Sequence, residues 1–356
     1  MSSLYVHIPF CVKKCNYCSF ISFPLEDEAF GRYFDALKQE FDQKIKTKLK
    51  TIYFGGGTPS VVPIEFYQKF KFDFTGNYEF TFEINPATVD ILYLKKLRSI
   101  GVNRLSIGVQ SFDDTLLKSI GRIHNSSQAL ECVKIAQVAG FENISIDLIY
   151  GLPNQSMKIW QQSLQKATTL GVQHISTYGL KIEKGTPFGE NPPKCLPDED
   201  LCADMYLQSV EILEQNGLKQ YEISNFAQKG KESRHNMTYW KNNPYIALGV
   251  SAHGYQDGIR YYNTSDFEKY LKNPTKPEFS EKLTEDEVFK EGIFLGLRMK
   301  QGLDLKEFQN RYNIDFEEKY ADILDKYKDF FEQKNGRIAL STQGLMLSNV
   351  ILSEFM

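Results

Sequence analysis

Three cysteines lie close together near the start of the chain, at Cys11, Cys15 and Cys18, with the spacing C-x3-C-x2-C. No fourth cysteine follows nearby, whereas a closed zinc site takes four ligands and a disulfide framework takes an even number of cysteines. Three thiolates on one short loop can instead hold three irons of a cubane [4Fe–4S] cluster. The fourth iron is then open to bind a small molecule and pass it an electron. A zinc ion that borrows a histidine and three unrelated thiols are the alternatives.

This spacing resembles the signature of the radical S-adenosylmethionine (AdoMet) superfamily. The resemblance implies that the open iron chelates the amino and carboxylate groups of AdoMet. An electron that enters the sulfonium then releases a 5′-deoxyadenosyl radical. Tyr17, directly before the third cysteine, offers an aromatic face on which an adenine could pack.

Further polar or special residues end several of the expected strands. The segment 55–59, GGGTP, follows an apolar run, and its glycines allow close approach of the backbone to a ligand or simply a tight turn. Glu83, Gln110 and Asp147 stand at or near the ends of three later strands. A carboxylate there can accept hydrogen bonds from ribose hydroxyls, and Arg122 can pair with a ligand carboxylate. For any one of these four residues taken singly, an ordinary rim or helix-cap role is the favoured interpretation.

Short β-rich runs alternate with helical patterns over the first 220 residues. Strands are expected at 4–9, 51–54, 78–85, 104–110, 144–150 and 174–180, and helices at 27–47, 88–99, 126–139, 155–170 and 198–216. The strands are nearly continuous in β-branched and aromatic residues, which is typical of a parallel sheet buried on both faces. Six βα units predict an α/β fold, a partial (βα)6 barrel, whose ligands bind at the carboxyl ends of the strands.

The alternation stops near residue 220. We expect a core over 1–220, a connecting segment over 221–271, a linker over 272–282, and a small, mostly helical, winged-helix-like domain over 284–356. The net charge of −3 excludes a nucleic-acid partner held by bulk electrostatics. The sequence shows no signal peptide and no membrane-spanning run, so we expect a cytoplasmic protein.

Several motifs together resemble the oxygen-independent coproporphyrinogen III oxidase group of radical AdoMet proteins. They are YVHIPFC at 5–11, GGGTPS at 55–60, FEINP at 82–86, SIGVQSF at 106–112 and IDLIYGLP at 146–153. By this resemblance, Tyr5, Gly56 and Glu83 contact the cluster-bound AdoMet. The neighbouring pocket, where the oxidase holds a second AdoMet, is lined by Gly57, Thr58, Gln110, Arg122 and Asp147.

The group contains true oxidases and haem chaperones, and three features favour the chaperones. The oxidases resemble C-x3-C-x2-C-x-C, but the position of the fourth cysteine is Phe20 here. The oxidases also carry a long extension before the first strand, whereas Tyr5 stands near the start of this sequence. Finally, HNMTYW at 235–240 is similar to the haem-handling motif of the chaperones. It makes His235 the expected axial ligand of haem, with His253 as a rival.

Two main hypotheses follow. The first is a haem chaperone that carries a [4Fe–4S] cluster and AdoMet, binds haem and passes it to haem-accepting proteins, membrane-bound respiratory enzymes among them; the resemblance also allows a homodimer. The second is an enzyme that decarboxylates two propionates of coproporphyrinogen III. A radical AdoMet enzyme with another substrate is a third possibility. We assign no catalytic residue from the sequence.

Overall fold

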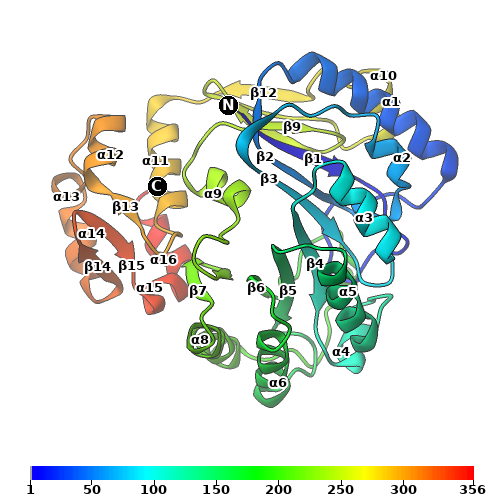
Figure 1. Ribbon diagram of the computed structural model, residues 1–356. Helices are drawn as coiled ribbons and strands as arrows, with labels where there is room; N and C mark the ends of the chain where they lie inside the picture. The colour runs from blue at the N-terminus through cyan, green and yellow to red at the C-terminus, as the bar shows by residue number, and fades with distance from the viewer. Residues whose placement is uncertain (1) are drawn as a thin grey trace.

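The computed structural model describes residues 2–356, and its centre is a nine-stranded sheet that curves into an arc (Figure 1). Six parallel strands follow one another in chain order: β1 (Ser2–Ile8), β2 (Leu49–Gly56), β3 (Phe74–Ile84), β4 (Arg104–Gln110), β5 (Ile144–Tyr150) and β6 (His174–Gly179). Each expected strand is present. The predicted α/β fold, a partial (βα)6 barrel, is confirmed.

Helices cover the outer side of this arc (Figure 1). The main ones are α1 (Asp27–Lys44), α3 (Ile91–Ser99), α5 (Ser126–Val138), α6 (Met157–Thr168) and α8 (Glu199–Gln215), with the shorter α2 (Ile64–Tyr67), α4 (Asp114–Ser119) and α7 (Pro187–Glu190) between them. The helix expected over 88–99 begins later than predicted, because Thr88 does not cap it. Asp90 does so, because its side chain accepts a hydrogen bond from the Tyr93 amide.

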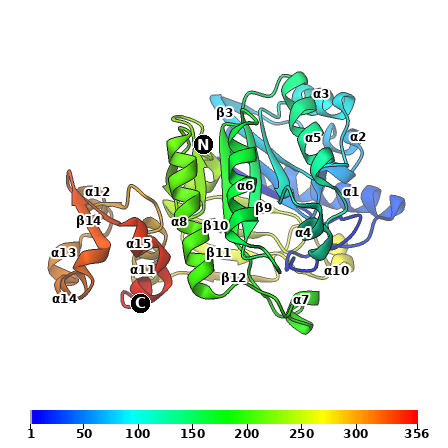
Figure 2. The same cartoon turned by 90° about the horizontal axis from the view of Figure 1, so that it is seen from below.

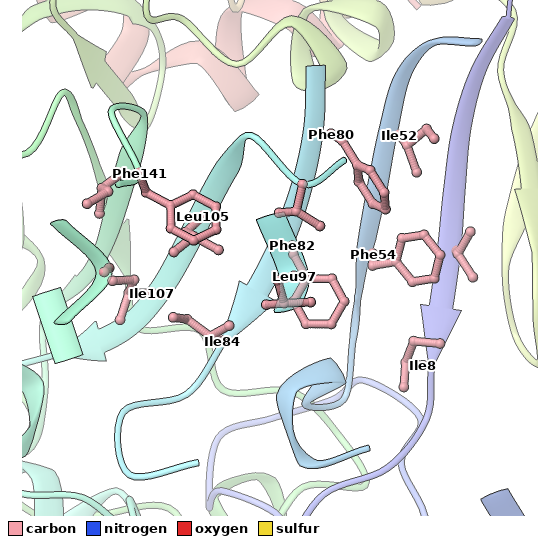
Figure 3. Packing of buried hydrophobic residues seen from close by; sticks show 14 of the residues in the cluster. Ile8, Ile52, Phe54, Phe80, Phe82, Ile84, Leu97, Leu105, Ile107 and Phe141 are labelled. Carbon is pink, nitrogen blue, oxygen red and sulfur yellow. The ribbon is translucent and has the colours of Figure 1, made fainter. Parts of the chain in front are cut away.

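The core lies between the sheet and these helices. Figure 3 shows apolar side chains of β1 to β4 packed in one layer with Leu97 of α3. The labelled strand residues are Ile8, Ile52, Phe54, Phe80, Phe82, Ile84, Leu105 and Ile107, all almost completely buried. Because side chains alternate along a strand, the residues between them point into the barrel.

The chain after residue 218 adds strands at both edges of the sheet. β7 (Lys219–Glu222) and β8 (Asn225–Ala227) continue it antiparallel beyond β6, and β9 (Ile246–Leu248) pairs parallel with β1. The helix α9 (Arg234–Trp240) lies on the inner side of the arc (Figure 1). The central sheet contains strands from both sides of residue 220. The predicted division into a core over 1–220 and a connecting segment over 221–271 therefore stays a prediction.

A second, three-stranded sheet joins β10 (His253–Gln256), β11 (Ile259–Tyr262) and β12 (Phe279–Lys282). The expectation of a plain linker over 272–282 is therefore wrong for its last four residues, which pair with β11. The helix α10 (Phe267–Lys272) precedes β12 and packs against α1.

A buried carboxylate ties α1 to this later part of the chain. Glu40 is fully buried, and its oxygens accept hydrogen bonds from the Gly249 amide and the Tyr270 hydroxyl, each at 2.8 Å. Asn263 and Lys44 also donate to it, at 2.8 and 2.7 Å. A buried carboxylate with four donors is well compensated, so it fixes these segments relative to one another.

The C-terminal part has its own apolar core and lies to one side of the barrel in both views (Figures 1 and 2). It contains α11 (Glu285–Gly296), β13 (Leu303–Asp304), α12 (Leu305–Tyr312), α13 (Phe316–Lys319), α14 (Ala321–Lys326), β14 (Phe331–Lys334), β15 (Arg337–Leu340), α15 (Thr342–Met346) and α16 (Ser348–Ser353). It is mostly helical as predicted, and its three short strands form a small sheet of their own. Within residues 2–356, no helix is long and apolar enough to cross a membrane.

Candidate functional site

The cysteine loop follows β1 and is fixed at both ends by backbone hydrogen bonds. The Phe23 amide donates to the Pro9 carbonyl at 2.6 Å, and the Cys11 amide donates to the Phe23 carbonyl at 3.2 Å. Beneath the loop, His7 Nε2 donates to the Ile21 carbonyl at 2.9 Å. Since this bond requires the proton on Nε2, His7 Nδ1 accepts from the Tyr5 hydroxyl at 3.1 Å. His7 thus packs beneath the loop.

All three loop cysteines are free thiols that line one cavity of about 480 Å³. Burial raises the thiol pKa of Cys11 and Cys18. Arg122 Nη1 donates to Cys15 Sγ at 3.5 Å, so a cation stands beside the place where thiolate charge must form. Among the described residues, no three Cys, His, Asp or Glu side chains gather as a single ion would require. A cubane attaches each of its ligands to a different iron, so it does not require the three sulfurs to converge on one ion.

The glycine segment packs directly against the cysteine loop. The amides of Gly57 and Thr58 donate to the carbonyls of Ile8 and Phe10, at 2.8 and 2.7 Å. Gly56 has a φ of +110°, and a Cβ there would lie 2.4 Å from the His7 ring. The sequence left two roles open for these glycines, a tight turn and close approach to a ligand. Both apply, because Gly56, Gly57 and Thr58 form the turn and also line the cavity.

Two half-buried carboxylates, Glu83 and Asp147, face the cavity. Glu83 accepts from the Tyr53 hydroxyl at 2.7 Å and from the Gly56 amide at 3.2 Å, and burial raises its pKa to about 7. Burial also raises the pKa of Asp147, which accepts from Ser106 at 3.4 Å. A cation or a hydrogen-bond donor that enters the cavity would favour the charged form of both carboxyls.

Gln110 and Arg122 line the same cavity. Gln110 ends β4 with a φ of +66°, an unusual backbone conformation for this residue type. Arg122 Nη2 donates to the Gly108 carbonyl at 2.5 Å and to the side chain of Asn85. These bonds lock the guanidinium across the ends of β3 and β4. The structure therefore brings together the three cysteines and seven of the nine other residues predicted for the site.

Inward-facing residues of the strands complete the wall, and our sequence analysis missed them. Along β4, alternate residues line the cavity, namely Arg104, Ser106, Gly108 and Gln110, whereas the residues between them are in the apolar core. Tyr53, Ser176 and Tyr178 line the cavity from β2 and β6. These residues could have been predicted from the alternation along each strand, in which every second side chain faces the same side, even though the strands look apolar throughout.

The remaining two, Tyr5 and His235, do not line this cavity. His235 has no exposed surface; its Nδ1 is 2.9 Å from Thr51 Oγ1 and its Nε2 is 2.7 Å from the Tyr239 hydroxyl. Burial lowers its pKa to about 3, so the imidazole is neutral. Both ring nitrogens are thus engaged within the protein.

The helix α9 closes the inner end of the barrel. The carboxylate of Glu79, on β3, accepts from the backbone amides of Arg234 and His235, at 3.0 and 2.9 Å. Asn236 faces the barrel cavity. The other side of the helix, with Met237, lines a larger cavity of about 1050 Å³. The helix that carries the HNMTYW motif therefore separates two cavities.

The second cavity carries more positive than negative side chains: Lys50, Arg234, Lys241 and Lys300 against Glu232 and Asp257. His253, the rival haem ligand, lies apart from both cavities' linings, on β10. It is exposed and pairs with the ring of Tyr262 at a centroid distance of 5.1 Å.

Comparison with known proteins decides the family. Residues 5–167 match the Radical SAM superfamily, and residues 283–347 match the HemN C-terminal domain. The chain is 38% identical to "Heme chaperone HemW" of Lactococcus lactis subsp. lactis, an alignment that covers 100% of this chain and 97% of the relative. The chain belongs to the HemW family. The HemW protein of Bacillus subtilis is 36% identical, over 100% of this chain and 99% of the relative.

The HemW family membership confirms the resemblance drawn from the motifs. As a radical SAM protein, this HemW-family chain has a [4Fe–4S] cluster and AdoMet as cofactors. The coproporphyrinogen III oxidase HemN of Escherichia coli shares the fold, with a TM-score of 0.85 at 22% identity over 99% of this chain and 89% of that one. At position 20, this HemW-family chain carries an exposed phenylalanine that lines the mouth of the cavity.

Proposed function

We propose that this chain is a haem chaperone, which binds a [4Fe–4S] cluster, AdoMet and haem and delivers haem to acceptor haemoproteins. The observation that carries the proposal is the full-length similarity to relatives named haem chaperones. Phe20 supports it, because the resemblance places a fourth cysteine of the oxidases at this position. Membrane-bound respiratory enzymes are one class of acceptor, reached from the cytoplasm, and a homodimer is the proposed assembly.

In this proposal Cys11, Cys15 and Cys18 hold the cluster, which supplies one electron at a time and an iron open to AdoMet. Gly56 and Glu83 hold AdoMet, the first through its backbone and the second by accepting from hydroxyl groups. Tyr5 supports them from behind, because its hydroxyl fixes the His7 ring on which Gly56 rests. We keep Tyr5 as a predicted AdoMet contact.

The adjoining pocket is proposed to take a second ligand. It is formed by Gly57, Thr58, Gln110, Arg122 and Asp147. Arg122 can supply positive charge and Asp147 negative charge to this pocket, so a zwitterionic ligand suits it. The bonds that Arg122 makes to Gly108 and Asn85 hold this charge in place before a ligand arrives.

Haem is the cargo, and His235 is its proposed axial ligand. Because both of its ring nitrogens are hydrogen-bonded and buried, ligation requires α9 to leave the barrel end. The larger cavity on the outer side of α9 offers room and an excess of cationic side chains for a propionate. Haem uptake is thus proposed to be coupled to an opening of the HNMTYW helix.

The test is anaerobic reconstitution of the cluster followed by a haem titration in the Soret band. Wild type should bind haem saturably, and His235→Gln, which keeps a hydrogen-bonding side chain, should bind it at least tenfold more weakly. His253→Ala is the matched control and should bind as wild type. Loss of binding in His253→Ala alone would move the ligand to β10. No saturable binding by wild type would remove the chaperone proposal.

The oxidase remains the second candidate because the cavity carries the residues predicted for two AdoMet molecules. The same reconstituted protein should then convert coproporphyrinogen III to protoporphyrinogen IX under reducing, anaerobic conditions with AdoMet. Product formation by wild type but not by Cys18→Ser would favour the oxidase over the chaperone.

A further inference from the structure

Arg104 is a buried cation without a partner. It is the first residue of β4 and is 2% exposed, the second largest of the fully buried side chains. Its Nε has no hydrogen-bond partner, and no carboxylate within residues 2–356 forms an ion pair with its guanidinium. Burying a charge costs several kcal/mol unless a counter-charge compensates it. An arginine in this state indicates that a partner is supplied from outside the chain.

The guanidinium lines the barrel cavity at the end away from the cysteine loop. Gln110, at the other end of β4, stands six strand residues further on, which is about 20 Å at the rise of a strand. Asn236 of α9 lines the same cavity, and burial together with the charge of Arg104 lowers the pKa of the adjacent His235, so α9 lies near the guanidinium. The part of a ligand that is chelated at the cysteine loop therefore cannot reach Arg104, and a different chemical group must bind at that end of the cavity.

The nearby acids do not neutralise Arg104. Among the described residues, neither Glu83 nor Asp147 forms an ion pair with its guanidinium, although both lie close enough for the charge of Arg104 to lower the pKa that burial raises. His174 offers no help, because its two ring nitrogens already contact Ser145 and Tyr221 at 2.7 and 2.8 Å. The inner end thus has an excess of hydrogen-bond donors and positive charge.

We propose that the inner end of the barrel cavity is a carboxylate-binding subsite, in which Arg104 and Asn236 receive the carboxylate of a bound ligand. A planar guanidinium and an amide donor match the two oxygens of a carboxylate. The subsite rests on the proposed function, since the carboxylate belongs either to the methionine moiety of an AdoMet molecule or to a propionate of haem.

The experiment uses the reconstituted full chain with Arg104→Met, which removes the charge at similar length, and Arg104→Lys, which keeps it. Arg260→Met is the matched control, because Arg260 pairs with Glu291 outside the cavity. Each protein is titrated with AdoMet and decarboxylated AdoMet, and with haem and its dimethyl ester. Thermal unfolding without ligand reports whether each variant folds.

For one of the two pairs, wild type should favour the acid over its carboxylate-free analogue at least tenfold. Arg104→Met should lower this preference at least tenfold, and Arg104→Lys should keep part of it. For the AdoMet pair, a residual preference from chelation at the open iron should remain in every variant. The AdoMet pair or the haem pair then identifies the source. Binding to both acids that Arg104→Met leaves unchanged would overturn the subsite while the chaperone proposal stands. The subsite would also be overturned if Arg104→Met lowered the unfolding temperature without changing the preference for either acid. A wild type that binds neither ligand would overturn the proposed function, and the subsite with it.

Discussion

Glu79→Gln should loosen the helix that covers His235 and thereby strengthen haem binding. In the wild type, one carboxylate oxygen accepts from the His235 amide and the other from the Arg234 amide. Glutamine has one oxygen and one NH2 group, so it can accept only one of the two bonds. The other amide then stays buried without an acceptor and faces a second donor, at a cost of about 2 kcal/mol.

The lost hydrogen bond destabilises only the closed position of α9, because the open position does not contain it. Since each 1.4 kcal/mol corresponds to a factor of ten, the open fraction of the helix should rise about 30-fold. A ligand that binds only the open form gains apparent affinity in the same proportion, as long as the closed form dominates. The Kd for haem in the Glu79→Gln variant should therefore be about 30-fold lower than in wild type.

Two measurements on the same protein check this prediction. Hydrogen exchange reports the opening of α9 through the amides of residues 234–240, and the Soret titration reports the affinity for haem. Ile338→Val, in the separate C-terminal core, should cost about 1 kcal/mol without changing haem affinity. Faster exchange in α9 with an unchanged or weaker haem affinity in Glu79→Gln would refute the reasoning, because His235 would then not be the group that opening exposes.

Four further predictions concern the rest of the molecule. Cys18→Ser should prevent cluster assembly, seen as the loss of visible iron–sulfur absorption after reconstitution, whereas Cys195→Ser should not. AdoMet affinity should rise between pH 6 and pH 8, because Glu83 has a pKa of about 7 and its ionised form suits a sulfonium ligand; Glu83→Gln should bind more weakly and without this pH dependence. Burial also raises the pKa of Glu222 to about 7, above its unfolded value, so its contribution to stability is full at low pH and is lost as the pH rises through 7. Glu222→Gln should therefore gain up to about 3 kcal/mol relative to wild type between pH 5 and pH 8 in denaturant unfolding. Glu40→Ala should lower the free energy of unfolding by about 3 kcal/mol, since it leaves the buried Gly249 amide and Tyr270 hydroxyl without their acceptor. An unfolding midpoint within error of wild type would contradict this account.

The strands of the barrel were predictable because each is a short apolar run that ends at a polar or glycine residue. The pattern also placed Glu83, Gln110 and Asp147 at one rim, where the structure has them with the cysteines. Arg104 was missed because a single polar residue at the start of a strand resembles an ordinary exposed end. Its burial depends on the curvature of the sheet, which no local pattern contains.

The orientation of His235 was likewise beyond local patterns. The motif predicts a chemically useful imidazole, and the side chain lies instead between Thr51 and Tyr239 because α9 packs inside the arc of strands. The three-residue strand β9 is too short to predict; it exists because β1 offers it a free edge. Similarly, β12 is recognisable only through its partner β11.

The pairing of β1 with β9 affects how the chain can fold during synthesis. β1 and β2 leave the ribosome early, yet the other edge of β1 stays open until residues 246–248 are made. At about 5 to 20 residues per second, that interval lasts on the order of ten to forty seconds. An open edge of an apolar strand is a template for pairing with other chains. We therefore expect nascent chains that stop before residue 246 to aggregate or to recruit chaperones, and chains that extend past Tyr270, where the Glu40 network is complete, to be released from them.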